Sequence, residues 1–436
     1  MTGRRPPAHR EAAAPLRYTQ YQMRAAFLAL TVVIHASPVA IEEYKTRRAE
    51  VRNKIDGVIV LFGAAEREHG DLRSGFRQEP NFFYLTGWEE PGAILVMTPE
   101  EELFFLPRRS ASRERYTGPK LAPQDADAQA RSGFTKVLPA AAFESSVRKL
   151  AESHERVFAV AGSTASSRLK ALLPLRDVSD AATVIARLRA IKSKAELALI
   201  QRATDVTIAA HRAAWERLRP GLFEYQIAAT MVGTYLDHGC ERNAYPPIVG
   251  SGPAAIILHY TRNTRRIDAG ELVLMDVGAE CAGYAADITR TVPAGGRFTA
   301  RQRELYEIVL GAQKAAIAAA KPGMTLTGDT DRSLVKIARD YINSRGKDRD
   351  GNSLGKYLLH GVSHHVGLEV HDAWDPTQPL AEGMIITVEP GIYIAGENIG
   401  IRIEDMILIT ADGARVLSSA LPKEPGEIES AVARKR

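Results

Sequence analysis

Residues 271–291 read ELVLMDVGAECAGYAADITRT, which is two apolar runs separated by a short turn. A turn centred on Cys281 and Ala282 predicts a β-hairpin in which Asp276 faces Asp287. Facing residues in an antiparallel pair lie about 4.5–5.5 Å apart. The sequence therefore predicts two carboxylates side by side, on strands that are otherwise suited to burial.

A second stretch, IITVEPGIYIAGENIGIRIE at residues 385–404, repeats this arrangement. With its turn at Gly396 and Glu397, Glu389 faces Glu404. A single acid on a strand is usually a solvated residue, but four acids in two opposed pairs are not explained in that way. Facing like charges and unpaired buried carboxylates are both destabilising.

Cations must therefore offset the four acids. Arg290 and Arg402 can each pair with one carboxylate, whereas divalent metal ions satisfy all four. Carboxylates that are able to bridge suit two ions about 3.5–4 Å apart, and such a pair can hold and deprotonate a water molecule.

Histidines gather in residues 360–372, HGVSHHVGLEVHD, which suits a strand or a tight loop in a cleft. This cluster of histidines beside four placed acids favours a site, and oxygen ligands with one imidazole favour Mn²⁺, with Co²⁺, Fe²⁺ or Zn²⁺ as alternatives. A further histidine, His259, follows the loop IVGSGP at 248–253. That loop lacks the glycine pattern and the lysine of a phosphate-binding loop, so nucleotide binding is not predicted.

The chain divides near Asp180 into two parts of different pattern. Before it, apolar strands are expected at 57–62, 81–87, 92–97 and 103–106, with helices at 41–55 and 141–154, which is typical of an α/β arrangement. After it, capping-box signatures start long helices at Ser193 and at Thr299, the second running to Lys321. This half indicates helices over a curved, largely antiparallel sheet. The fold class is therefore α+β, with a leader at 1–40, domains at 41–180 and 181–420, and a tail at 421–436.

The composition is that of an ordinary globular chain, with 436 residues, 45% of them hydrophobic. Residues 1–40 hold five Arg and one Glu, which leaves 52 basic and 51 acidic residues elsewhere, so nucleic-acid binding is not predicted. Residues 23–40 have the pattern of a signal peptide or of an apolar element of the fold, so we expect a cytoplasmic or an exported protein. No stretch has the roughly 18 apolar residues of a membrane span. Cys240 and Cys281 are interpreted as two small, partly buried side chains.

The second half of the chain resembles the pita-bread metallopeptidases, and most of all the Xaa-Pro aminopeptidases (aminopeptidase P). Residues 360–372 match the Xaa-Pro aminopeptidase and prolidase signature throughout, and 257–260 (ILHY), 389–393 (EPGIY) and 400–405 (GIRIED) are also similar to family motifs. Upstream, FRQEPNFFYLTG at 76–87 is similar to the non-catalytic N-terminal domain of aminopeptidase P and prolidase.

The resemblance implies a site and a reaction. The family's ligand order falls on Asp276, Asp287, His364, Glu389 and Glu404. It implies two metal ions and the hydrolysis of Xaa-Pro bonds at the N-termini of peptides with proline in second position, by homodimers or tetramers. Glu389 would move a proton to the proline nitrogen, His259 and His371 would steady the reacting oxygens, and Tyr393 and Arg402 would support the site.

Alternatives remain at this point. A prolidase, which accepts only Xaa-Pro dipeptides, differs mainly in pocket depth, and a methionine aminopeptidase would not need the N-terminal domain. Non-catalytic binding relatives of this fold lose metal ligands, whereas all five are present here. Departures from the family pattern are Met406 in place of a second Asp, a short segment between His371 and Glu389, and His365 in place of a larger aromatic residue. They concern the substrate pocket and touch no ligand.

Overall fold

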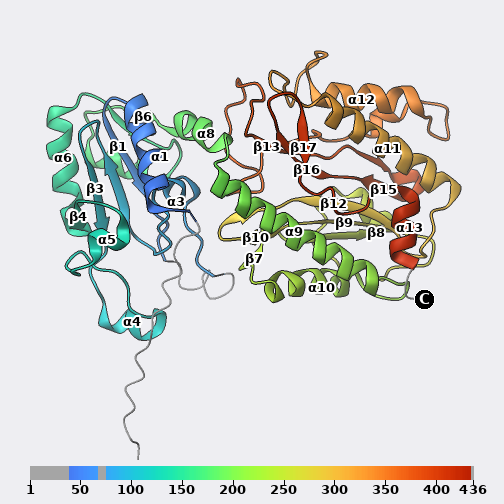
Figure 1. The fold of residues 1–436 in the computed structure, drawn as a ribbon, viewed down its shortest axis with the longest axis horizontal. Helices are drawn as coiled ribbons and strands as arrows, with labels where there is room; N and C mark the ends of the chain where they lie inside the picture. Colours follow the sequence, from blue (N-terminus) through green and yellow to red (C-terminus); the bar gives the residue numbers. More distant parts are fainter. Residues whose placement is uncertain (1–38, 67–74, 434–436) are drawn as a thin grey trace, which may run out of the picture. The chain divides into compact units, whose positions relative to one another are not determined.

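The computed structural model describes residues 39–66 and 75–433, so nearly all of the expected leader lies outside the described residues. In the first part of the chain, six strands form one mixed sheet in the order β4-β3-β2-β1-β5-β6 (Figure 1). These strands are β1 (Val58–Phe62), β2 (Ile94–Met97), β3 (Glu102–Leu106), β4 (Val137–Pro139), β5 (Val157–Ala159) and β6 (Val178–Asp180). The helices are α1 (Ile41–Lys54), α3 (Pro80–Thr86), α4 (Ala111–Thr117), α5 (Ala128–Ser132), α6 (Phe143–Ser153), α7 (Thr164–Leu172) and α8 (Ala182–Ala190).

The strands expected at 57–62, 92–97 and 103–106 are confirmed as β1, β2 and β3. The strand expected at 81–87 is wrong, because this segment forms helix α3. Glu79 caps the helix by accepting a hydrogen bond from the backbone N–H of Phe82 at 2.6 Å, and Pro80 occupies its first turn. Gly87 ends it in the left-handed region at φ 63°. These capping residues outweigh the β-propensity of the aromatic run.

The second part holds helices over small antiparallel sheets, as expected. Its sheets have the orders β11-β10-β7, β12-β9-β8, β13-β16-β17 and β14-β15. The strands are β7 (Arg242–Asn243), β8 (Ile248–Ser251), β9 (Leu272–Val277), β10 (Ala279–Cys281), β11 (Tyr284–Ala285), β12 (Ile288–Pro293), β13 (Ile385–Val388), β14 (Gly391–Ile394), β15 (Ile399–Arg402), β16 (Asp405–Ile409) and β17 (Ala414–Val416). The helices are α9 (Lys194–Arg217), α10 (Glu224–Asp237), α11 (Ala300–Ala319), α12 (Leu334–Arg345) and α13 (Pro425–Ala433).

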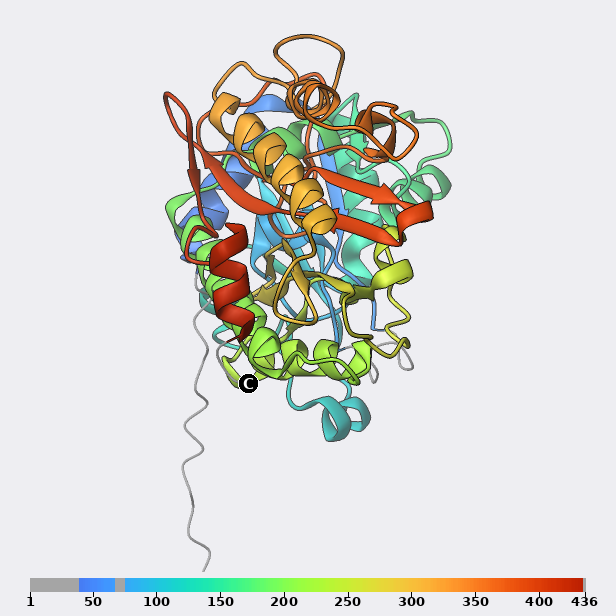
Figure 2. The ribbon, with the colours of Figure 1, turned by 90° about the vertical axis from the view of Figure 1, so that its right-hand side faces the viewer.

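Both expected capping boxes are present, at Ser193 for α9 and at Thr299 for α11. Helices α9 and α10 pack against each other and against the strands around β8, β10 and β12 (Figure 1). Helix α11, drawn in orange across the strands in Figure 2, packs against β13, β14 and β15. Helix α13 falls in the stretch expected to be a tail, and its Ile428 is fully buried. Among the described residues, no helix has the length and apolar character to cross a bilayer.

The register of the first hairpin differs from the expected one. Asp276 pairs with Thr289, not with Asp287. The turn lies one residue later than expected, at Ala282 and Gly283, which both have positive φ values of 50° and 79°. The partner of Asp276 therefore moves by two residues, and the period of two along a strand keeps both acids on the same face.

The register of the second hairpin is confirmed. Gly391 pairs with Arg402 in the β14–β15 ladder, and Val388 pairs with Asp405 in the β13–β16 ladder. Glu389 and Glu404 lie in the break between these two ladders. Two carboxylates are thus brought together at a point where the backbone pairing is interrupted.

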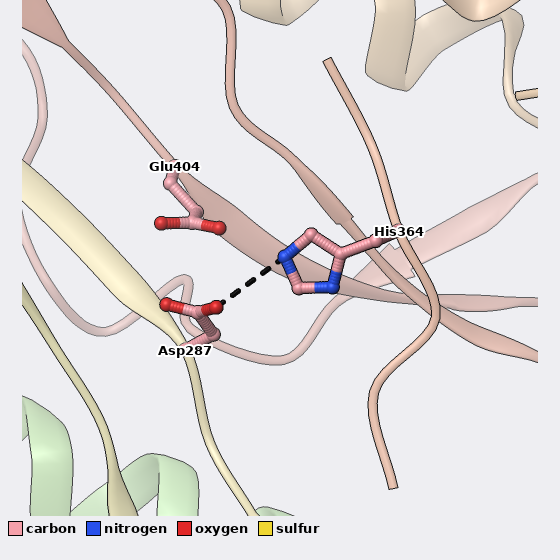
Figure 3. A group of neighbouring side chains, drawn as sticks. All are labelled: Asp287, His364 and Glu404. Carbon is pink, nitrogen blue, oxygen red and sulfur yellow. Dashed lines mark ion pairs between the residues drawn. The ribbon is translucent and has the colours of Figure 1, made fainter. Parts of the chain in front are cut away.

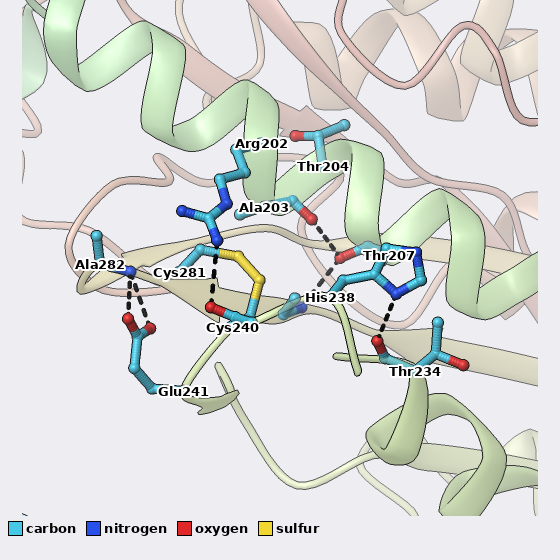
Figure 4. The surroundings of a disulfide bond; sticks show 12 residues. Arg202, Ala203, Thr204, Thr207, Thr234, His238, Cys240, Glu241, Cys281 and Ala282 are labelled. Atoms are coloured by element: carbon cyan, nitrogen blue, oxygen red, sulfur yellow. Dashed lines mark hydrogen bonds between the residues drawn. A yellow bond between two sulfur atoms is a disulfide. The ribbon is translucent and has the colours of Figure 1, made fainter. Parts of the chain in front are cut away.

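The interpretation of the cysteines as separate side chains is wrong, because Cys240 and Cys281 form a disulfide (Figure 4). The segment that follows α10 runs antiparallel to β10, with a hydrogen bond from Glu241 N to Glu280 O at 3.2 Å. This pairing brings the two Cα atoms to 4.4 Å. A sequence separation of 41 residues carries no spacing signal for such a bond.

Candidate metallopeptidase site

The predicted site residues converge on one cavity of ≈ 580 Å³ in the second part of the chain. They come from separate stretches of backbone: the segment 257–260, strand β9, the residue before β12, the residue after β13, the end of β15 with the residues that follow it, and the loop at 360–372. The predicted residues that line the cavity are His259, Asp276, Asp287, His364, His371, Glu389, Arg402 and Glu404. Tyr393 contacts the site from β14, through its hydroxyl.

Three of the side chains that line the cavity lie close enough together to hold one metal ion. One ligand atom each of Asp287, His364 and Glu404 lies within 4.8 Å of the others (Figure 3). Nε2 of His364 is 3.4 Å from Oδ2 of Asp287 and 3.4 Å from Oε1 of Glu389. Nδ1 of His364 contacts the carbonyl oxygen of His365 at 3.1 Å, which leaves Nε2 directed at the acids.

Asp276 lies between a cation and a phenol. The guanidinium of Arg402 contacts Oδ2 of Asp276, and the hydroxyl of Tyr245 donates to Oδ1 at 2.5 Å. Tyr245 also donates to Asp287, so one hydroxyl joins the two acids of the first hairpin. Arg402 therefore pairs with one of the four acids, as expected.

Arg290, the other arginine considered, does not contact any of the four carboxylates. It pairs with Asp405 at 2.7 Å and donates to the backbone oxygen of Glu404. Its charge is paired with that of Asp405, and both side chains are buried.

The charges of the acids are not balanced by these cations. Burial, followed by the nearby carboxylates, raises the pKa of Glu404 well above its usual range, and burial followed by Asp276 raises that of Asp287. Burial is also the main cause that raises the pKa of Glu389 to about 7. The pKa of His364 rises to about 9, because its acidic neighbours outweigh the burial that lowers it. The protein alone therefore holds protons at this site near neutral pH.

The residues fit divalent metal ions. Four carboxylates and one imidazole form a donor set suited to hard or borderline ions. Within the described part of the chain, the buried Oε1 of Glu404 has no hydrogen-bond partner, while Oε2 accepts from Thr289 at 2.6 Å. A buried carboxylate oxygen without a donor calls for a cation.

Two further histidines line the same cavity on its open side. His259 and His371 are exposed, and the ring of His371 lies 4.1 Å from the ring of His364. Burial and the neighbouring His364 lower the pKa of His371 to about 4. A neutral imidazole has one N–H to donate and one nitrogen to accept, which suits contact with a polar substrate.

Sequence reasoning missed two contributors to the site. The sequence motif that contains His360 gives no separate role to this residue. Its Nε2 lies 2.7 Å from the hydroxyl of Tyr393, and the same hydroxyl accepts a hydrogen bond from Arg402 at 2.7 Å. Tyr245 was not considered at all. It precedes strand β8, and its approach to Asp276 and Asp287 depends on tertiary contacts that no local pattern indicates.

Comparisons with known proteins agree with this architecture. The model of Metallopeptidase family M24 matches residues 198–411, and that of Aminopeptidase P, N-terminal domain, matches residues 44–158. The Xaa-Pro aminopeptidase of Haemophilus influenzae is 34% identical, over 89% of this chain and 96% of its own length. The chain belongs to the aminopeptidase P family of M24 metallopeptidases.

Two other comparisons define the reach of this likeness. A structure of a variant of Escherichia coli aminopeptidase P superimposes with a TM-score of 0.82 at 30% identity, over 91% of this chain and 99% of that one. An Xaa-Pro dipeptidase of Pyrococcus furiosus is 41% identical, but over 54% of this chain and 65% of its own length. The α+β class, with a pita-bread fold and an aminopeptidase P-type N-terminal domain, is confirmed.

Proposed function

We propose that this chain hydrolyses the Xaa-Pro bond at the N-terminus of peptides with proline in second position. The observation that carries the proposal is the convergence of four acids and His364 with two exposed histidines in one cavity. The relatives that match nearly end to end are named Xaa-Pro aminopeptidases, whereas the dipeptidase matches over about half of the chain. This favours the aminopeptidase over the prolidase alternative.

We also propose that Asp276, Asp287, His364, Glu389 and Glu404 hold two divalent ions, with Mn²⁺ as the first choice. Bound there, such ions activate a water molecule and stabilise negative charge on the carbonyl oxygen. We assign the domains to 41–180 and 181–420, a division supported by the two family matches. Assembly into dimers or tetramers stays a prediction.

The chain's own residues then handle protons and orientation. Glu389 takes a proton from the attacking water and delivers it to the proline nitrogen as the bond breaks. His259 and His371 donate hydrogen bonds from the open side of the cavity to the carbonyl oxygen. Arg402 fixes Asp276, and Tyr393 links Arg402 to His360.

The test is hydrolysis of Arg-Pro-Pro and of Ala-Pro by protein loaded with Mn²⁺, each with and without EDTA. EDTA-sensitive release of Arg from the tripeptide supports the proposal. Cleavage of the dipeptide alone moves the assignment to prolidase. Stoichiometric metal without either activity overturns the substrate class while leaving the ligand assignment standing.

A further inference from the structure

A buried ion-pair cluster holds the end of the loop at 360–372, which we call the histidine loop. Asp372, which follows His371, accepts from Arg189 and, at 2.9 Å, from Nζ of Lys192. The side chains of Arg189 and Lys192 are each 1% exposed and that of Asp372 is 2% exposed. Burial alone would raise the pKa of Asp372, but the two cations outweigh it and lower the pKa. Asp372 is therefore a buried carboxylate matched by two buried cations.

Arg189 also forms hydrogen bonds with residues other than Asp372. It stands at the end of α8, and its guanidinium also donates to Glu369 at 3.0 Å and to the side-chain oxygen of Asn81, on α3, at 2.7 Å. One planar group thus fixes two points of the histidine loop and one point of the first domain. Lysine carries its three N–H donors on one nitrogen, so it does not reproduce the planar fork of the guanidinium.

The loop is packed tightly around this cluster. A Cβ added to Gly367 would lie 2.2 Å from Oδ2 of Asp372 and 3.0 Å from Nζ of Lys192. Nζ of Lys192 also donates to the backbone oxygen of Arg189 at 2.6 Å, which ties the cluster to the end of α8. The carboxylate of Asp372 is thus held between two cations and directly against the backbone of Gly367.

The backbone carries this position to the two site histidines. The amide of Asp372 donates to the carbonyl oxygen of His365 at 2.9 Å, and the same oxygen contacts Nδ1 of His364 at 3.1 Å. His371 precedes Asp372 in the chain, and its ring lies 4.1 Å from that of His364. The orientation of both rings therefore depends on where Asp372 is held.

We propose that Arg189 and Lys192 are positioning residues for the reaction, because their clamp on Asp372 fixes the loop that aims His371 into the cavity and orients His364. The proposal rests on the roles given above to these two histidines. Residues that orient a ligand or a donor from behind typically change activity about 10- to 100-fold when they are removed.

The chain offers a matched control on the same helix. Arg187 of α8 pairs at 2.7 Å with Asp375, which lies three residues beyond Asp372, just after the histidine loop. The side chain of Arg187 is 58% exposed. The variant R187Q removes a helix-to-loop ion pair without touching the clamp. It should leave kcat and KM for Arg-Pro-Pro within about twofold of wild type, because Arg187 is solvent-exposed and the buried Asp375 keeps its hydrogen bonds from Thr377.

The experiment compares R189Q and R187Q, each in the wild-type and in the H371A background, with metal content measured throughout. R189Q should lower kcat about 10-fold or more with little change in KM. This loss should be smaller in H371A, where only the part that acts through His364 remains, since residues that act through one group are not additive. Wild-type kcat in R189Q, or a loss of the same size in H371A, overturns the proposal. If R189Q does not fold, R189K takes its place and should show a smaller loss with the same non-additivity.

A readout without turnover separates this proposal from the proposed function. In protein labelled with ¹⁵N-histidine, R189Q should shift the ring signals of His364 and His371, which single-histidine variants assign, and R187Q should not. If wild-type protein fails to cleave Arg-Pro-Pro but these shifts occur, the substrate assignment fails and the positioning role stands. Unchanged ring signals in R189Q overturn the positioning role.

Discussion

The phenolic oxygen of Tyr245 lies 2.5 Å from Oδ1 of Asp276 and also donates to Asp287. A single hydroxyl hydrogen serves two carboxylates that are proposed to bind metal. Burial and these acids raise the pKa of Tyr245 well above its usual range, so the phenol stays protonated. In the metal-free protein Tyr245 is therefore the donor that moderates the repulsion between the acids of the first hairpin.

The variant Y245F should consequently destabilise the metal-free protein more than the metal-loaded one. Without the Tyr245 hydroxyl, the buried carboxylates of Asp276 and Asp287 lose a hydrogen-bond donor. This loss should lower the free energy of unfolding by about 1–3 kcal/mol. Added Mn²⁺ supplies the missing positive charge and should narrow the difference from wild type. Urea unfolding with EDTA and with Mn²⁺ measures both values, and an equal difference in the two conditions contradicts this role.

The stability of the metal-free protein should fall as pH rises. Glu389 has a pKa of about 7 in the folded protein against about 4.5 when unfolded. Because the folded form binds this proton more tightly, its contribution is complete below pH 4.5 and is lost between pH 4.5 and about 7. His364, raised to about 9, adds a loss in the same direction between pH 6.5 and about 9.

The measurement is the free energy of unfolding in urea with EDTA between pH 5 and pH 9. We expect a fall of the order of 2 kcal/mol across the Glu389 window. The variant E389Q should flatten the lower part of the curve, while E382Q, at an exposed acid of the same domain, should follow wild type. A wild-type curve that rises over this range with EDTA would contradict the assignment.

The variant D287A should lose both metal and activity. Asp287 belongs to the group of three side chains that lie close enough to hold an ion and shares Tyr245 with Asp276, so its removal takes away one of the five proposed metal ligands. Calorimetric titration should show no tight Mn²⁺ site, and hydrolysis of Arg-Pro-Pro should fall at least about 10³-fold. D268A removes an exposed acid and should change neither value. Retained activity in D287A would sink the ligand scheme.

The gathering of the four acids could be predicted because both hairpins combine apolar runs with one acid on each side of a turn. The first register slipped because its turn uses Ala282 and Gly283, and Ala282 is not a residue that signals a positive φ of 50°. Asp276 and Asp287 nevertheless line the same cavity, since an offset of two residues leaves them on one face. In the second hairpin the turn lies where the sequence predicts it, so the predicted register is correct.

The wrongly predicted strand at 81–87 and the unpredicted contacts of Tyr245 and Arg189 have different causes. The helix at Pro80–Thr86 was recoverable, because Glu79, Pro80 and Gly87 are capping signals that the aromatic run concealed. The approach of Tyr245 to the acids was not, since it depends on how distant strands pack. The same holds for Arg189 and Asp372, which lie 183 residues apart in the chain.

The disulfide leads to a last prediction. Cys240 and Cys281 are 41 residues apart, and closing a loop of this length restricts the unfolded chain by about 4 kcal/mol in the chain-entropy account. Neither cysteine lines the site cavity, so the double variant C240S/C281S should lose stability and keep the kcat of wild type at 25 °C. Urea unfolding of both proteins, with and without dithiothreitol, measures the difference.

Dithiothreitol should bring the unfolding midpoint of the wild type down to that of C240S/C281S and should leave the variant's own midpoint unchanged. The bond is buried, with Cys240 3% and Cys281 0% exposed, so the reductant reaches it as the chain unfolds, and samples must be equilibrated at each urea concentration. A wild-type midpoint that does not respond to the reductant means that the thiols are not joined. A loss of kcat in the folded variant means that the bond also holds β10, and with it the Asp276–Asp287 hairpin, in its active register.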